Sequence, residues 1–264
     1  MSVLIAIPAR FASTRYPGKP LVLLRGPDGE KSLIRRSWDA AMAVHGVDRV
    51  VVATDDSRIA DHAAGFGAEV VMTSPDCQNG TERCAEVSAK LPGFDVVVNL
   101  QGDAPLTPAW FVEDLIAGLR ADPDADCATP VLRCDGRAVS GFLADRRAGR
   151  VGGTTAVFGA NGRGLYFSKE VIPYTGRVYG DAEMTPVFHH VGVYAFRPGA
   201  LAAYPGWAVG PLELLEGLEQ LRFLENGRVV TCIEVQARGR QFWELNNPED
   251  VPKIEAMMQD MNAA

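Results

Sequence analysis

Short apolar runs alternate with amphipathic stretches along the first half of the chain. Four runs are rich in Val, Ile, Leu and Ala: residues 3–7, 49–53, 68–72 and 95–100. Such runs are typical of parallel strands that are covered on both faces. Between the runs, apolar residues recur at helical spacing around residues 34–42 and 112–119. The alternation predicts an α/β fold with a doubly wound, mostly parallel, Rossmann-like sheet.

The pattern changes in the middle of the chain, from about residue 141 to 204. Short strands are expected at residues 154–158 and 190–196, on either side of a polar, glycine-rich stretch. We interpret this segment as an excursion, either a flap or a dimerisation element, from a single domain that spans residues 1–264.

The last part of the chain returns to the alternation of the first. Leucines on one side predict a helix over residues 211–226, and Gly227 supplies its natural end. A strand is expected at residues 229–235. Pro248 stands where a first helical turn would begin, so we predict that it opens the last helix.

Composition and charge exclude several classes of protein. The net charge is −7 and the chain has no basic run, which argues against a nucleic-acid partner. The apolar start, residues 3–7, meets Pro8 and Arg10 and is too short for a signal peptide or a membrane span, so we expect a cytoplasmic protein without membrane insertion. The five cysteines are odd in number and form no CxxC pair, which favours free thiols over a disulfide or zinc site.

A loop rich in small residues and cations directly follows the first predicted strand. This segment, residues 8–20, reads PARFASTRYPGKP and carries Arg10, Arg15 and Lys19. Backbone N–H groups in such a loop can cradle phosphate oxygens while the cations neutralise a polyphosphate. The loop has neither the GxxxxGK[ST] nor the GxGxxG pattern. It is therefore a candidate phosphate-binding loop of another kind, and the alternative is a basic surface loop.

A carboxylate follows a second buried strand, in the segment NLQGDAP at residues 99–105. Asp103 suits a Mg²⁺ that bridges substrate phosphates, because Mg²⁺ needs only one or two protein carboxylates. The alternative is a simple Gly-Asp turn. Since the carboxyl ends of parallel strands share one edge of the sheet, we expect Asp103 to lie near the phosphate loop.

Further polar groups stand at the start of a helix and late in the chain. Asn79 and Gly80 turn the chain into a helix whose first turn carries Arg83, and Asn79 or Thr81 can cap that helix. Arg83 is also placed to face an anionic substrate. The later polar residues, taken singly, are typical of helix surfaces or caps.

Taken together, the motifs resemble those of the 3-deoxy-manno-octulosonate (Kdo) cytidylyltransferases, also called CMP-Kdo synthetases. The matching segments run in order along almost the whole chain: PARFASTRYPGKPL, ATDD, NGTER, NLQGD, LYFSKEVIPY, HVGVYAF and PLELLEGLEQLR. Only residues 136–160 match poorly.

The resemblance implies the nucleotidylyltransferase fold and a transfer reaction. A CTP and an acidic keto sugar of the Kdo type would give the CMP-sugar and pyrophosphate, with Mg²⁺ as cofactor. The resemblance also implies a homodimer in the cytoplasm and a role in nucleotide-sugar and lipopolysaccharide biosynthesis.

By the same resemblance, residues are assigned to four roles. The catalytic residues would be Arg10, Lys19 and Asp103. The nucleotide would contact Pro8, Ala9, Arg10, Ser13, Lys19, Gly80 and Asp103. The sugar acid would contact Arg83, Gln101, His190, Tyr194, Glu219 and Gln220. The metal would be held by Asp103 and Asn246.

The chain departs from the family's usual residues at four positions. Ala104 stands where the family usually has a glutamate, and Asn246 where it usually has a metal-binding aspartate. Thr155 stands at the position of a usual lysine, and His189 at that of a common arginine. Two alternatives therefore remain beside Kdo activation. One is a nucleotidylyltransferase for another acidic sugar, of the sialic-acid type, and the other is a catalytically weak paralogue that binds nucleotide.

Overall fold

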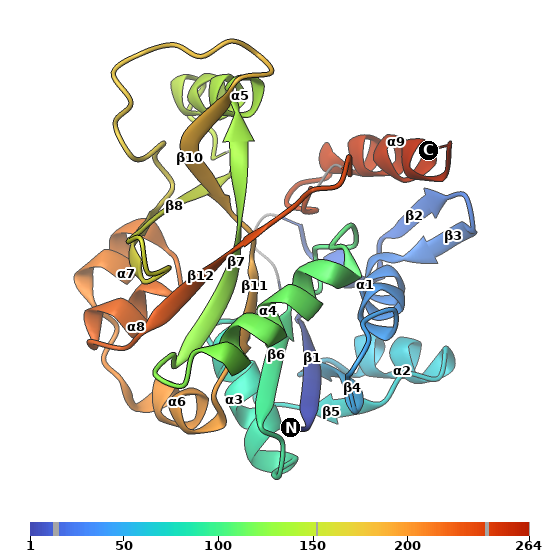
Figure 1. Ribbon diagram of the computed structural model, residues 1–264. Helices are drawn as coiled ribbons and strands as arrows, with labels where there is room; N and C mark the ends of the chain where they lie inside the picture. Colours follow the sequence, from blue (N-terminus) through green and yellow to red (C-terminus); the bar gives the residue numbers. More distant parts are fainter. Residues whose placement is uncertain (13–15, 152, 241–242, 264) are drawn as a thin grey trace. The chain divides into compact units, whose positions relative to one another are not determined.

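The computed structural model describes residues 1–12, 16–151, 153–240 and 243–263 (Figure 1). The chain divides into two compact units. The first comprises Met1–Glu113, Phe196–Pro205 and Ala237–Ala264, and the second comprises Asp114–Ala195 and Gly206–Gln236. The predicted single domain with an excursion over residues 141–204 stays a prediction.

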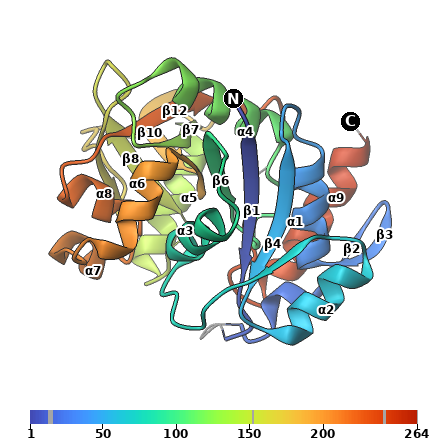
Figure 2. The same cartoon turned by 90° about the horizontal axis from the view of Figure 1, so that it is seen from below.

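The first unit is built on four parallel strands in the order β5-β4-β1-β6. Their bounds are β1 (Val3–Ala9), β4 (Arg49–Thr54), β5 (Val70–Met72) and β6 (Val96–Leu100). β1 pairs with β4 on one side and with β6 on the other, as Figure 2 shows. All residues of β6 are buried, which explains the continuous apolar run predicted from the sequence.

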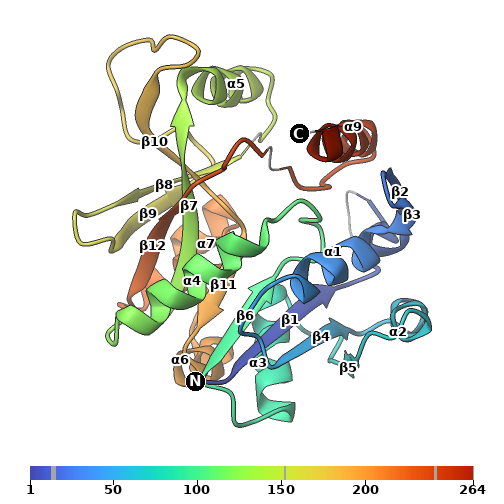
Figure 3. The ribbon, with the colours of Figure 1, turned by 45° about the vertical axis from the view of Figure 1, so that its right-hand side comes forward.

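The order in which the chain adds strands to the sheet of the first unit reverses at β1. The chain passes through α1 (Leu33–Met42) to β4 and through α2 (Ser57–Gly65) to β5, and α3 (Gly80–Lys90) then returns it past β1 to β6. Right-handed crossovers in opposite directions place α1 and α3 on opposite faces, and Figure 3 shows them on either side of β1. The carboxyl ends of β1 and β6 therefore flank the switch point where such sheets bind ligands.

A hairpin follows the predicted phosphate loop. Its strands are β2 (Leu23–Gly26) and β3 (Gly29–Ser32), after the 3₁₀ turn η1 (Lys19–Leu21). The last helix, α9 (Asp250–Ala263), packs on this hairpin through a core cluster of six buried residues: Leu24, Leu33, Leu106, Leu245, Ile254 and Met258. The end of the chain thus stabilises the segment that comes directly after Lys19.

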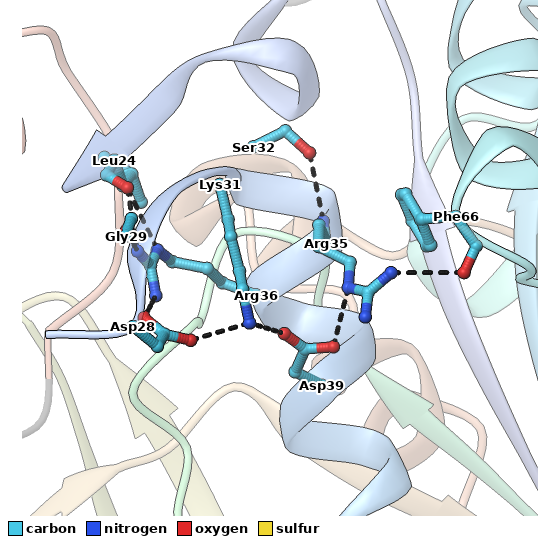
Figure 4. A network of polar contacts seen from close by, with 9 residues as sticks. All are labelled: Leu24, Asp28, Gly29, Lys31, Ser32, Arg35, Arg36, Asp39 and Phe66. Carbon is cyan, nitrogen blue, oxygen red and sulfur yellow. Dashed lines mark hydrogen bonds and ion pairs between the residues drawn. The ribbon is translucent and has the colours of Figure 1, made fainter. Parts of the chain in front are cut away.

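A polar network fixes the hairpin to α1 (Figure 4). The buried Arg36 guanidinium donates to the carbonyls of Leu24 at 2.8 Å and Gly29 at 2.6 Å, and pairs with Asp28 at 2.9 Å. Lys31 contacts the same carboxylate at 2.6 Å. The hydrogen bond from Lys31, more than the Arg36 contact, lowers the pKa of Asp28 to about 2, so this carboxylate is ionised at neutral pH.

The second unit contains a mixed sheet in the order β11-β7-β10-β8-β9, with β12 also paired to β7. Its strands are β7 (Cys127–Asp135), β8 (Thr154–Phe158), β9 (Gly164–Ser168), β10 (Met184–His190), β11 (Val193–Phe196) and β12 (Val230–Val235). β12 runs parallel to β7 and β10 runs antiparallel to it, and Figure 1 shows both beside β7.

The remaining helices are short except for two. They are α4 (Ala109–Ala121), α5 (Gly136–Arg147), α6 (Pro198–Ala203), the 3₁₀ turn η2 (Tyr204–Gly206), α7 (Pro211–Glu216) and α8 (Leu221–Glu225). Asp135 caps α5 by accepting from the Ala138 N–H at 2.8 Å. This cap explains why a helix begins in a segment with little apolar periodicity.

Three sequence predictions about elements are wrong in detail. The helix expected over residues 211–226 is two helices, because Gly217 adopts φ 60° and ends α7. The strand expected over residues 190–196 is divided between β10 and β11. Pro248 does not open α9, which begins at Asp250, and instead its carbonyl accepts from the Val251 N–H at 3.2 Å.

All five cysteines are free thiols, as the sequence predicts. Cys77 is partly buried, and the other four are buried: Cys84, Cys127, Cys134 and Cys232. Burial raises the pKa of Cys232 to about 12 and, together with a hydrogen bond to Glu86, that of Cys77 to about 11. These thiols therefore remain protonated at neutral pH.

Candidate functional site

Two loops that leave neighbouring strands bring a cation and a carboxylate into contact. Lys19 Nζ donates to Asp103 Oδ2 at 2.7 Å, although the residues are 84 positions apart. Their side chains are 13% and 25% exposed, so each keeps a part that a ligand can reach. Two of the three predicted catalytic residues thus lie together at the carboxyl edge of the sheet, and Arg10 is exposed at the start of the same loop.

The loop that carries Lys19 is closed on itself. The Gly18 N–H donates to the Phe11 carbonyl at 3.0 Å, and Gly18 adopts φ 70°. The Arg58 guanidinium lies over the Phe11 ring, 3.3 Å from its centre, and is itself held by Asp56 at 2.6 Å. A cation over an aromatic face is attractive, so α2 helps to fix this loop. Ser13, predicted to contact the nucleotide, lies outside the described residues.

We expect Gly18→Ala to weaken binding of CTP, the nucleotide that the resemblance implies, by about five- to thirtyfold. A left-handed conformation costs a residue with a Cβ roughly 1–2 kcal/mol, and the added atom would lie 3.1 Å from Phe11 Cζ. Titration calorimetry with CTP would measure the loss. Gly65→Ala is the matched control, because no atom lies within 4 Å of its added Cβ; equal affinities in both variants would contradict the expectation.

The amino end of α3 approaches the same edge. Asn79 caps the helix by accepting from the Glu82 N–H at 2.9 Å, as predicted. A Cβ at Gly80 would lie 3.3 Å from Pro8 Cγ, 3.0 Å from Asn99 Nδ2 and 3.2 Å from Gln101 Nε2. Three residues predicted to contact substrates, Pro8, Gly80 and Gln101, are therefore close neighbours.

Arg83 is turned into the first unit. Its side chain is only 4% exposed, and its guanidinium lies 3.3 Å from Asp55 Oδ1 and contacts the Thr73 hydroxyl. The sequence pattern revealed the cation but not this partner, although Asp55 stands in the ATDD segment after β4. The predicted contact of Arg83 with the sugar acid stays a prediction, and any such contact would involve a guanidinium that Asp55 already neutralises.

The two predicted metal-binding residues lie on adjoining segments. The Leu245 N–H donates to the Asp103 carbonyl at 2.9 Å, which places Asn246 next to the Asp103 loop. Asp250 holds the Asn246 backbone by accepting from its N–H at 3.0 Å. One carboxylate and one amide oxygen suit Mg²⁺, which retains most of its waters. Among the described residues no group of three or more His, Cys, Asp or Glu forms a denser metal site.

Within the second unit, His190 is buried and uncharged. Burial, and secondarily His189, lowers the pKa of His190 to about 3. Its Nε2 lies 2.9 Å from the Thr129 hydroxyl, whose own proton points to the carbonyl of Val193 at 2.9 Å. A hydroxyl has a single proton, and with that proton assigned to the Val193 carbonyl, Nε2 carries the imidazole hydrogen and donates it. Nδ1 is then an acceptor, suited to a hydroxyl rather than a carboxylate.

Two other predicted sugar-acid residues join this cluster. The Tyr194 ring lies 5.6 Å from the His190 ring, and its hydroxyl donates to Gln220 Oε1 at 3.0 Å. Gln220 is 1% exposed, and its Nε2 has no hydrogen-bond partner within the described chain. A buried donor without an acceptor is costly, and a ligand is one way to satisfy it. Glu219, next to Gln220, is partly buried.

Comparison with known proteins identifies the family. A family model described as cytidylyltransferase matches residues 4–234.

The chain belongs to the cytidylyltransferase family.

The similar proteins cover the chain almost end to end. A 3-deoxy-manno-octulosonate cytidylyltransferase of Maricaulis maris is 44% identical over 98% of this chain and 97% of that protein. One from Chlamydia pneumoniae is 41% identical over 94% and 91%. The solved structure of a CMP:2-keto-3-deoxy-manno-octonic acid synthetase complexed with CTP is 32% identical, with a TM-score of 0.82 over 98% of each chain. The α/β nucleotidylyltransferase fold predicted from the sequence is confirmed.

All four unusual residues lack a charge that the resemblance leads us to expect. Ala104 is fully buried in the turn after β6. Thr155 is buried and donates to the Glu170 carbonyl at 2.6 Å. Burial lowers the pKa of His189 to about 4, so it is neutral where the family commonly has an arginine. The positive charges usual at positions 155 and 189 are therefore not replaced.

No helix in the described ranges is both long and apolar enough to cross a membrane.

Proposed function

We propose that this member of the cytidylyltransferase family transfers CMP from CTP to a 2-keto-3-deoxy sugar acid of the Kdo type, with release of pyrophosphate. The observation that carries the proposal is the contact of Lys19 with Asp103 at the switch point of the sheet. The names of the similar proteins, 3-deoxy-manno-octulosonate cytidylyltransferases, support this choice of substrates.

In the proposed reaction the first unit binds CTP and orients its phosphates. The hydroxyl on the anomeric carbon of the sugar acid attacks the α-phosphorus in line, and the bond to pyrophosphate breaks. Such a transfer needs positioning and charge neutralisation more than covalent help from the protein. Arg10 and the Lys19 ammonium would neutralise the phosphates, and Lys19 is already oriented by Asp103.

A divalent cation is part of the proposal. Asp103 and Asn246 would hold Mg²⁺, which supplies charge neutralisation at the phosphates when it is bound. The donor set fits this ion, because Asp103 keeps an exposed part and Asn246 is fixed beside its loop. The Lys19 contact orients the Asp103 carboxylate while leaving its second oxygen for other partners.

Recognition of the sugar acid is assigned to the buried cluster of the second unit. Neutral His190 would accept a hydroxyl at Nδ1, and Gln220 Nε2 would donate to a hydroxyl or carboxylate oxygen. A site built to pair with a particular polar group rejects analogues that leave its own groups unpaired. The cluster therefore favours a polyhydroxylated substrate.

A pyrophosphate-release assay tests the proposed function. Four nucleoside triphosphates would be crossed with Kdo, 8-amino-Kdo and sialic acid. Release with CTP and Kdo or its amino analogue supports the proposal. Release only with sialic acid would mean that the substrate is a sugar of the sialic-acid type. No pyrophosphate release with any pair of substrates, despite measurable CTP binding, would indicate a nucleotide-binding paralogue.

We expect Asn246→Asp to lower the Mg²⁺ concentration at half-maximal activity by about fivefold. A carboxylate adds a charge that attracts the ion by about 1 kcal/mol in water-like surroundings, and about 1.4 kcal/mol corresponds to tenfold in affinity. Activity measured against Mg²⁺ concentration gives the shift.

Asn247→Asp is the matched control for this prediction. It makes the same change of charge one residue further along, where the side chain is exposed. Identical Mg²⁺ curves for wild type and Asn246→Asp, or equal shifts in both variants, would rule out position 246 as a metal ligand.

The resemblance also supports a wider setting for the enzyme. We propose a homodimer in the cytoplasm whose CMP-sugar serves lipopolysaccharide or related nucleotide-sugar biosynthesis. Light scattering on the purified protein tests the dimer, and a monomer mass at micromolar concentration would contradict it. Loss of lipopolysaccharide in a deletion strain tests the pathway, and fractionation of cell extracts tests the compartment.

A further inference from the structure

The break between α7 and α8 changes the direction of Gln220. In an unbroken helix, Gln220 would follow Glu216 by four residues and would therefore lie on the same face. In the structure the chain turns at Gly217, and the two side chains face different strands. Glu216 contacts β9, whereas Gln220 contacts Tyr194 on β11. The break thus determines where the Gln220 amide points.

Glu216 fixes this break to the sheet. Its Oε1 accepts from the Ser168 hydroxyl at 2.6 Å and from the Tyr166 hydroxyl at 3.3 Å, and its Oε2 accepts from the Lys169 N–H at 2.9 Å. Burial, and then the neighbouring Glu216, raises the pKa of Tyr166, so this hydroxyl keeps its proton. A carboxylate with two donors from β9 and one from the residue that follows it holds the end of α7 firmly.

The backbone at the break depends on the next residue. Gly217 adopts φ 60°, and its N–H donates to the Glu213 carbonyl at 2.7 Å. A Cβ there would lie 3.1 Å from Lys169 Nζ. Glycine permits the left-handed turn at little cost. Glycine alone does not choose the direction of α8. The Arg222–Glu213 ion pair holds the two helices together, and the contacts of Glu216 attach the break to β9.

We propose that Glu216 is a positioning residue for the sugar acid: its attachment to β9 holds the helix break that orients Gln220. This inference rests on the proposed function, since Gln220 is placed in the sugar-acid site there. Glu216 itself need not contact either substrate. Its removal should therefore affect the two substrates differently.

The test compares Glu216→Ala with Glu234→Ala by steady-state kinetics in both substrates. Glu234 is a matched control because it is a partly exposed carboxylate that contacts Arg133 on the same sheet. We expect Glu216→Ala to raise the KM for the keto acid about tenfold, the loss of roughly one oriented hydrogen bond. The KM for CTP should stay within about twofold.

A second variant distinguishes a loss of Gln220 orientation from a general loss of folded structure. Glu216→Gln keeps one oxygen for Ser168 and Tyr166. We therefore expect its KM for the keto acid to lie between those of the wild type and Glu216→Ala. Equal rises in the KM for both substrates, or an unchanged keto-acid KM in Glu216→Ala, would overturn the inference.

Hydrogen exchange distinguishes this inference from the proposed function. If wild type releases no pyrophosphate with any keto acid, the proposed function fails. Amide exchange over residues 217–222 then still tests the anchor: faster exchange in Glu216→Ala than in Glu234→Ala supports it, and equal rates overturn it.

Discussion

Lys19→Ala is expected to lower kcat by about 10²–10³-fold, because it removes a preorganised cation from the place where the proposed function puts the CTP phosphates. Lys19 Nζ is held 2.7 Å from Asp103 and is largely shielded from water, which strengthens its field. Pyrophosphate release at saturating CTP and keto acid measures the loss. The midpoint of thermal unfolding should shift by no more than about 4 °C, since the remaining Asp103 can be hydrated.

Lys90→Ala is the control for this prediction. Lys90 also pairs with a carboxylate, Glu86 at 2.7 Å, but it is 48% exposed and lies at the far end of α3 from the loop. Its removal should leave kcat within about twofold. Full activity in Lys19→Ala would remove the loop from the mechanism, whereas Lys19→Arg should retain the charge but lose part of the positioning.

Arg222→Met is expected to lower the free energy of unfolding by about 3–5 kcal/mol, the usual cost of leaving one member of a buried ion pair alone. Arg222 donates to Glu213 through two hydrogen bonds, at 2.7 and 2.8 Å, and the side chains are only 3% and 9% exposed. Urea unfolding measures the change. The pair joins α7 to α8, so its loss should also loosen the helix break.

Two further variants identify the source of that loss. Arg133→Met removes a surface pair with Glu234 and should cost less than about 1 kcal/mol. Glu213→Leu combined with Arg222→Met replaces both charges by apolar groups and should recover most of the stability. If the double variant is as unstable as the single one, an unpaired buried charge is not the cause.

The central strands and the meeting of the loops after β1 and β6 could be predicted from the sequence, because they follow from burial and parallel connection. A strand covered on both faces is mostly apolar, and the central residues of β1, β4 and β6 satisfy this condition. Parallel connection then places the loops after β1 and β6 at one edge, which predicts that Lys19 and Asp103 are close.

Elements set by polar tertiary contacts could not be predicted in the same way. The leucines of residues 211–226 predict one helix, but Leu214 and Leu215 are 72% and 82% exposed. Glu216 binds Ser168, which is 48 positions away in the sequence, and Glu213 pairs with Arg222 across the break between α7 and α8. β7 contains Thr, Pro and Arg among its residues and gives no clear strand pattern, although it is central to its sheet.

The ionisation state and the contact partners of individual site residues could not be predicted from the sequence either. The sequence shows that Arg83 is a cation, but only the structure shows it beside Asp55. Likewise, a histidine in a sequence has no fixed charge. The burial of His190 makes it neutral, and only the structure shows the Thr129 hydroxyl beside one of its ring nitrogens.

The span of 84 residues between Lys19 and Asp103 bears on the order in which the protein is made. A nascent chain that ends before β6 already contains β1, β4 and β5, which pair with one another. It contains the predicted phosphate loop but neither Asp103 nor β6, the strand that borders the switch point. Because contacts distant in sequence form late, we expect the contact between Lys19 and Asp103 to form only after β6 has been synthesised.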